Sequence, residues 1–107
     1  MTIANQIVIE SVEGKEKQLK EALNDLVASS LPEKGCQKFE FYQLYNRATS
    51  FFIIEIWKSE KRYNGHLESA SYVKQMSIIN PLIASTQTHN LKLTQCLTKL
   101  GLKEEKK

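Results

Sequence analysis

The side chains best suited to acid–base chemistry in this sequence are concentrated between positions 55 and 66. Glu55 and Trp57 lie in a largely apolar run that ends at Lys58, and His66 follows in the next, more polar segment. A neutral imidazole can accept a proton near pH 7, so a histidine can act as a general base. An indole N–H can donate a hydrogen bond to a substrate oxygen. We therefore take His66, Glu55 and Trp57 as candidate catalytic residues.

Glu55 is the most informative of the three because it stands between Ile54 and Ile56. A carboxylate among apolar neighbours must pair, ionise less readily or face a water-filled cavity. A contact with His66 would orient the imidazole ring and raise its basicity, or it would only satisfy two buried polar groups. From the sequence, both interpretations, catalysis and packing, stay open.

Three further residues are candidates for substrate binding. Asn5 interrupts an isoleucine-rich alternating segment, and a buried amide needs hydrogen-bond partners. It would orient a substrate carbonyl, or it would bond to Gln95 across a sheet. Tyr72 and Met76 are candidates to line a pocket, with an ordinary place in a helix core as the alternative.

The composition limits the classes of partner. The chain has 107 residues and a net charge of +3, with lysines dispersed among glutamates, so nucleic-acid binding is not expected. Its two cysteines form no CxxC or Cys/His pattern, so we expect no metal site and no resident cofactor. No apolar run approaches the ~20 residues that cross a bilayer, and no secretory signal pattern is visible. We expect a cytoplasmic protein without a membrane partner.

The elements that must position these side chains follow from the spacing of apolar residues. Alternation with period two predicts strands over Thr2–Ser11, Cys36–Arg47, Phe51–Lys58 and Thr86–Thr98. Spacings of three and four predict a helix from Lys15 to about Ser30. They also predict helical pieces from Ser59 to about Leu67 and from Ser69 or Ser71 to about Ile79, stopped or redirected by Pro81.

The order strand, helix, strand, strand, helix, strand predicts an α+β, ferredoxin-like βαββαβ fold with a four-stranded antiparallel sheet. We expect one domain over residues 1–98 and a flexible, charged C-terminal tail over residues 99–107. The helices should cover one face of the sheet. The segments Ile3–Ile9, Phe51–Trp57 and Leu91–Leu97 leave the other face apolar, which predicts a two-fold homodimer with the sheets face to face.

Two adjacent motifs resemble the antibiotic biosynthesis monooxygenase (ABM) domain family. "PEKGCQKFEFYQ" leads into "FFIIEIWKSEKRYNGHLESASYVKQM". The matching features are a glycine before the second strand, an acidic residue two before a tryptophan, a serine at a helix start, and a histidine followed by an apolar residue and a serine. They are Gly35, Glu55, Trp57, Ser59, His66, Leu67 and Ser69. The resemblance covers about residues 2–97 and implies a dimeric α/β barrel.

The resemblance implies a cofactor-independent monooxygenase that oxidises a quinol-like or phenolic small aromatic molecule with molecular oxygen. His66, poised by Glu55, would take the phenol proton, while Trp57 and Asn5 would hold the substrate oxygen. One alternative is a non-catalytic dimer that binds a small ligand.

The other alternative is a haem-degrading monooxygenase, with which Asn5 and Trp57 agree. However, the position of that branch's iron ligand falls near Ser77. Ile53 also departs from the asparagine that some aromatic-oxidising members carry there. A further branch of the family isomerises a small phosphorylated sugar.

Overall fold

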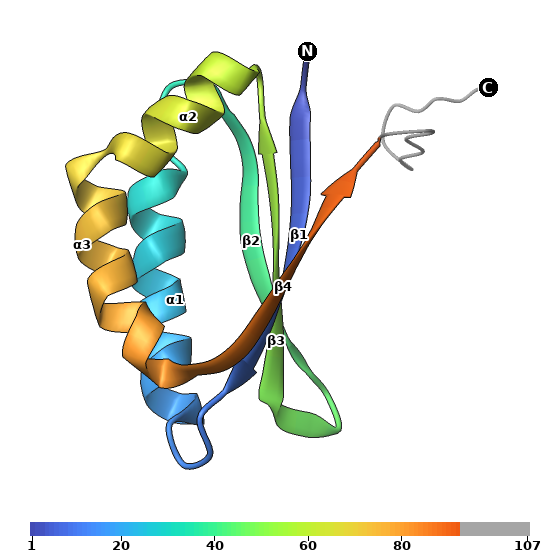
Figure 1. Ribbon diagram of the computed structural model, residues 1–107, viewed down its shortest axis with the longest axis vertical. Helices are drawn as coiled ribbons and strands as arrows, with labels where there is room; N and C mark the ends of the chain where they lie inside the picture. Colours follow the sequence, from blue (N-terminus) through green and yellow to red (C-terminus); the bar gives the residue numbers. More distant parts are fainter. Residues whose placement is uncertain (93–107) are drawn as a thin grey trace.

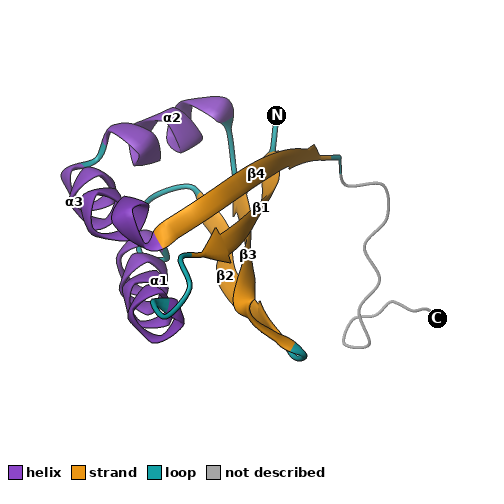
Figure 2. Cartoon of the chain, turned by 60° about the horizontal axis from the view of Figure 1, so that its bottom comes forward, coloured by secondary structure: helices purple, strands orange, loops and turns teal. Residues whose placement is uncertain are grey.

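The computed structural model describes residues 1–92 and confirms the predicted ferredoxin-like α+β fold (Figure 1). Its elements are β1 (Ile3–Ser11), α1 (Glu16–Ser30), β2 (Cys36–Leu44), β3 (Arg47–Trp57), α2 (Glu60–Glu68), α3 (Ala70–Ile79), a 3₁₀ turn (Asn80–Leu82) and β4 (Ile83–Leu91). The four strands form one antiparallel sheet in the order β2-β3-β1-β4. All three helices lie on the same side of this sheet (Figure 2).

Three predicted boundaries are wrong. The second strand ends at Leu44 rather than at Arg47, and β3 begins at Arg47 rather than at Phe51, because Leu44 already pairs with Arg47 across a two-residue turn. β4 begins at Ile83, earlier than the predicted Thr86, because the strand follows directly on the 3₁₀ turn that contains Pro81. The rest of the predicted fourth strand, the domain end at residue 98 and the tail at 99–107 lie outside the described residues.

The core lies between the helices and one face of the sheet. Ile9, Phe51, Ile53 and Trp57 point toward the helices and are at most 4% exposed. Apolar side chains of the helices cover them, chiefly Leu19, Leu23 and Leu26 of α1 and Ile79 of α3. Burial of one such side chain stabilises the fold by about 1.5–3 kcal/mol.

The opposite face of the sheet carries an apolar patch, which lies among polar residues such as Gln6, Lys38 and Glu40. The predicted segments Ile3–Ile9 and Phe51–Trp57 each divide between the two faces, because successive side chains of a strand point to opposite sides. The outer face carries Val8, Tyr42, Phe52, Ile54, Ile56 and Leu91. Tyr42 and Phe52 stack there, with ring centroids 5.0 Å apart. We call this set the outer apolar face.

Two serine caps set the direction of the helices that carry the candidate residues. The Arg62 N–H donates to Ser59 Oγ at 3.2 Å at the start of α2, and the Tyr72 N–H donates to Ser69 Oγ at 3.2 Å at the start of α3. Such caps satisfy backbone donors that a helix start leaves free. Ser69 also ends α2 in an extended conformation, so the chain turns between His66 and Tyr72.

Glu10 should make the stability of the fold depend on acidic pH. Hydrogen bonds from Ser50, at 2.6 Å, and from Thr49, together with Arg47, lower the pKa of the Glu10 carboxyl from 4.5 to about 2. Because the folded state binds this proton less readily, its stabilisation is present above pH 4.5 and is lost as the pH falls through about 2.

Urea unfolding measured at several acidic pH values should therefore show a smaller loss of stability in Glu10→Gln than in the wild type. Glu13→Gln, a change at an exposed position in the following turn, is the matched control and should keep the wild-type slope. Equal slopes in wild type and Glu10→Gln would refute the role of this carboxylate.

Candidate functional site

A cavity of about 230 Å³ lies between the sheet and the helices. Most of its wall is apolar, and its polar groups are one carboxylate, one imidazole, two phenols, an amide and two threonines. The polar residues are Glu55, His66, Tyr63, Tyr72, Asn80, Thr86 and Thr88; the apolar ones include Ile7, Ile9, Leu23, Leu26, Phe39, Ile53, Leu67, Met76, Ile79 and Ile83. Within residues 1–92, no lysine or arginine lines this cavity.

The Glu55 carboxylate is buried at the cavity wall, where it is 3% exposed. Trp57 Nε1–H donates to its Oε1 at 2.8 Å, and Asn5 Nδ2–H donates to its Oε2 at 3.2 Å. Antiparallel pairing places Asn5 directly opposite Glu55 in the sheet. Each carboxylate oxygen therefore has a donor from the protein itself, as a buried charge requires.

Asn5 and Trp57 thus contact Glu55, and neither is among the residues that line the cavity. The sequence analysis assigned both residues to the substrate oxygen. In the structure, both donate hydrogen bonds to the carboxylate of Glu55 instead. The alternative partner expected for Asn5, Gln95, lies outside the described residues.

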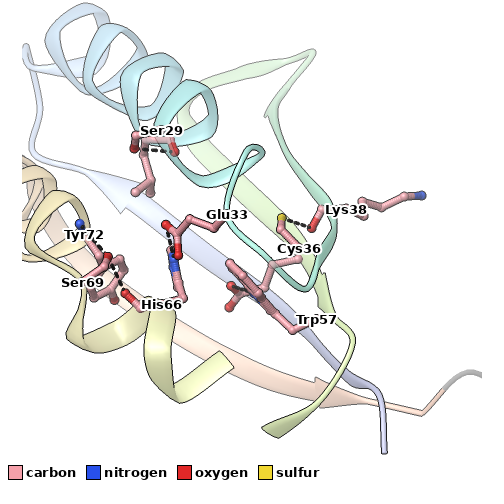
Figure 3. Close-up of polar contacts among 10 residues, drawn as sticks. Ser29, Glu33, Cys36, Lys38, Trp57, His66, Ser69 and Tyr72 are labelled. Carbon is pink, nitrogen blue, oxygen red and sulfur yellow. Dashed lines mark hydrogen bonds and ion pairs between the residues drawn. The ribbon is translucent and has the colours of Figure 1, made fainter. Parts of the chain in front are cut away.

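In the structure the imidazole of His66 pairs with Glu33 rather than with Glu55, the partner considered from the sequence. His66 is 2% exposed, and its Nδ1 lies 3.0 Å from Oε2 of Glu33, in the loop between α1 and β2 (Figure 3). The imidazole lies between the rings of Trp57, at 4.4 Å, and Tyr72, at 4.6 Å between centroids. Glu55 and His66 line the same cavity, but each is held by a different partner.

Two tyrosines bring hydroxyl donors to the cavity. Burial raises the pKa of the Tyr72 hydroxyl, and the charge of Glu55 raises it further. Burial raises the pKa of the Tyr63 hydroxyl as well, and the charges of Glu55 and Tyr72 raise it further. A hydrogen bond with Asn5 partly offsets this rise. Both phenols therefore keep their protons at neutral pH, and a protonated hydroxyl can donate to a substrate oxygen.

Tyr72 and Met76 line the cavity as predicted, whereas Tyr63 was missed. A signal for Tyr63 was present, since it precedes His66 by one helical turn and therefore shares its face of α2. Thr86 and Thr88 of β4 were also missed, although both lie within the predicted fourth strand, because a threonine in a polar alternating segment gives no signal of its own.

The arrangement could hold a small molecule that combines an apolar body with a polar group. Its apolar part would contact the isoleucines and leucines, while its polar group would lie among the imidazole and the phenols.

No group of three or more His, Cys, Asp or Glu side chains within residues 1–92 is placed to hold a metal ion. No helix in this described part of the chain is long and apolar enough to cross a membrane.

Solved structures with the same fold come from several organisms. A protein from Nitrosomonas europaea, provisionally named an antibiotic biosynthesis monooxygenase, matches with a TM-score of 0.80 at 22% identity, over 86% of this chain and 97% of its own. A conserved protein of unknown function from Bacteroides thetaiotaomicron, for which oxidoreductase activity is suggested, gives 0.79 at 23%, over 84% and 95%. Rv0793 from Mycobacterium tuberculosis gives 0.82 at 14%, over 92% and 100%. At these identities the likeness shows the fold.

The family follows from the sequence itself. Among curated proteins, none matches this chain significantly. The sequence profile named antibiotic biosynthesis monooxygenase (ABM) matches residues 2–76. This range is more than half of the chain and contains Asn5, Glu55, Trp57, His66 and Tyr72. The chain therefore belongs to the antibiotic biosynthesis monooxygenase family.

Proposed function

We propose that this protein is a cofactor-independent monooxygenase that oxidises a neutral phenolic or quinol-like aromatic molecule with molecular oxygen. The observation that carries the proposal is the cavity of about 230 Å³, in which an apolar wall meets His66, Tyr63 and Tyr72. Membership of the ABM family supports the reaction class. The likeness to the Nitrosomonas europaea protein is consistent with it.

The reaction needs no external reductant when the substrate is a phenol with a free para C–H. 1-Naphthol and one O₂ give 1,4-naphthoquinone and one water, so atoms and electrons balance. In the first step the O–H bond of the phenol breaks and an N–H bond forms at His66. The phenolate then passes one electron to oxygen, and the two radicals join at the para carbon as a peroxide.

The second half of the reaction returns the proton. The His66 imidazolium protonates the peroxide and becomes neutral again. The imidazole then takes the para C–H proton as the O–O bond breaks, and this proton joins the departing hydroxide, which gives water and leaves the quinone. Tyr63 and Tyr72 hold the substrate oxygen by donating hydrogen bonds. The protein contributes exclusion of water and positioning, and the substrate supplies the electrons.

The charge of the cavity narrows the substrate class. Glu55 is acidic, and no lysine or arginine lines the cavity within residues 1–92. A phosphorylated or carboxylated substrate would bring a buried negative charge toward Glu55 without a cation to compensate it. This disfavours the sugar-phosphate chemistry of one branch of the family. The volume suits one or two fused aromatic rings.

The assembly in this proposal is a homodimer that covers the outer apolar face. Val8, Tyr42 and Leu91 of that face are 38%, 45% and 43% exposed in the single chain. An apolar patch over several strands is typical of an interface. Sedimentation equilibrium should give the mass of two chains of 12.3 kDa each; the mass of one chain would refute the dimer.

A non-catalytic, ligand-binding dimer is the second candidate. It is favoured by the fact that each Glu55 oxygen already accepts a hydrogen bond, from Trp57 or from Asn5, so the buried carboxylate is accounted for without a role in proton transfer. The haem-degrading alternative has less support. Ser77, near the position of that branch's iron ligand, is exposed on α3, and its hydroxyl donates to the Lys74 carbonyl.

The deciding experiment is oxygen uptake by the purified protein with a panel of naphthols and quinols, with quinone formation followed in parallel. We expect one quinone formed for each O₂ consumed with neutral substrates, and much slower uptake with hydroxynaphthoates. Ligand-induced fluorescence change without uptake of oxygen would favour the binding dimer. A Soret shift on titration with haemin would favour the haem enzyme.

A further inference from the structure

We propose that Glu33 is a positioning residue that fixes the tautomer of His66, so that Nδ1 carries the proton and Nε2 is left as the base. The consequence for catalysis rests on the proposed function; the tautomer itself does not. No pattern in the sequence singles out Glu33, which lies 33 positions before His66 in the chain.

The contact itself defines the proton position. Glu33 Oε2 lies 3.0 Å from His66 Nδ1, and the two side chains are 21% and 1% exposed. An ionised carboxylate has only acceptors, so the proton between the two atoms belongs to the imidazole nitrogen. A neutral imidazole carries one N–H, which leaves Nε2 with a free lone pair. His66 also lines the cavity, and in this arrangement Nε2 is the nitrogen left for a bound substrate.

The backbone around Glu33 holds the carboxylate in place. Its N–H donates to the Ser30 carbonyl at 3.0 Å, and its own carbonyl accepts from the Cys36 N–H at 3.1 Å. The loop is also tied to the end of β3, because the Lys58 N–H donates to the Gly35 carbonyl at 2.7 Å. The Glu33 side chain therefore starts from a fixed backbone, and less entropy is lost when it pairs.

Gly35 allows this loop to approach the helix that carries His66. Its φ is +87°, and a Cβ at this position would lie 2.5 Å from Cβ and 2.4 Å from Cγ of Arg62 on α2. Only glycine combines this conformation with such close contact. The glycine that the sequence resemblance singled out thus serves the approach of Glu33 to His66.

Titratable groups surround the imidazole on both of its sides. On the cavity side they are the Glu55 carboxylate and the protonated phenols of Tyr63 and Tyr72. On the other side, His66 borders a surface cleft that Glu33 shares with Lys34, Lys61 and Arg62. Glu33 is the acidic group in direct contact with the ring. When His66 takes up a substrate proton, the imidazolium that forms is therefore paired with Glu33, as in other histidine–carboxylate pairs.

The test is the protonation state of the two ring nitrogens, measured by long-range proton–nitrogen NMR on protein labelled at histidine. The chain has two histidines, His66 and His89, so His89→Asn identifies the signals of His66. In the wild type at neutral pH, we expect Nε2 of His66 to resonate downfield as an unprotonated nitrogen and Nδ1 as a protonated one. A proton on Nε2 in the wild type would overturn the proposal.

Glu33→Ala and Glu33→Gln supply the comparison. Alanine should allow the tautomers to mix, whereas glutamine, whose amide oxygen still accepts a hydrogen bond, should preserve part of the preference. An unchanged tautomer in Glu33→Ala would overturn the proposal. Glu68→Gln, an exposed change at the end of α2, is the matched control and should leave the spectrum of His66 unchanged.

The activity measurement separates this proposal from the proposed function. With an active substrate, Glu33→Ala should lower kcat by about 10- to 100-fold with little change in KM, since the effect acts on the base rather than on binding. An equal kcat in Glu33→Ala and wild type would overturn the catalytic consequence. If the wild type consumes no oxygen with any substrate, the proposed function fails, and the tautomer is still decided by NMR.

Discussion

Replacing His66 by alanine should lower kcat for oxygen-dependent phenol oxidation by about 10²- to 10⁴-fold, the usual contribution of a general base. The imidazole is the group at the cavity with the proton affinity to accept a phenol proton near neutral pH, because the two tyrosines there have raised pKa values and stay protonated. The measurement is the initial rate of oxygen uptake at saturating substrate, with circular dichroism to verify folding.

The comparison needs a variant that keeps the packing of the buried ring. His66→Gln retains a polar side chain of similar length and should be as inactive as alanine, because an amide is not a base at neutral pH. Asn64→Ala changes an exposed residue of the same helix and should keep the wild-type rate. Oxygen uptake at the wild-type rate in folded His66→Ala would show that the imidazole is not the base.

Trp57→Phe should destabilise the fold by about 3 kcal/mol, part from the smaller ring and part from the lost donor. Trp57 is fully buried, and its indole N–H is the 2.8 Å donor to Oε1 of Glu55. Phenylalanine keeps the aromatic contact with Phe39, whose ring centroid lies 6.5 Å away, but leaves one oxygen of a buried carboxylate without a partner. Urea unfolding at a fixed protein concentration measures the change.

A double-mutant cycle separates the carboxylate from the packing. Glu55→Met replaces the charge by an apolar side chain of similar volume, so Trp57→Phe no longer leaves a charge unpaired in this background. We expect Trp57→Phe to cost at least ~1 kcal/mol less in Glu55→Met than in the wild-type protein. Additive free energies would mean that the indole stabilises the fold by its volume alone.

The order of elements could be read from the sequence because each one follows a single strong pattern. Alternation in β1 and the apolar stripe of α1 leave little choice of element type. The side of β3 that faces the helices could not be predicted from the sequence. Both of its sets, with Ile53 on one side and Ile54 on the other, are apolar, so alternation alone does not say which set is covered.

Site residues could be predicted where a polar side chain stands among apolar neighbours in the sequence. Glu55 among isoleucines and Asn5 in a strand both indicated buried polar groups, and they bond to each other. Glu33 gave no such signal, because a glutamate in a polar loop is ordinary. Its contact with His66 depends on how the loop docks on α2, a tertiary feature that no spacing within either segment encodes.

The alternation in β3 has a consequence for how this chain can change over evolution. Odd-numbered positions from Phe51 to Trp57 serve the interior, and the even-numbered ones between them form the outer apolar face. Deleting a single codon ahead of Glu55 in this stretch would reverse the facing of the residues after the deletion and bring Glu55 to the outside. Length variants that retain a working interior should therefore arise at the hairpin turn around Tyr45, or by removal of residues two at a time.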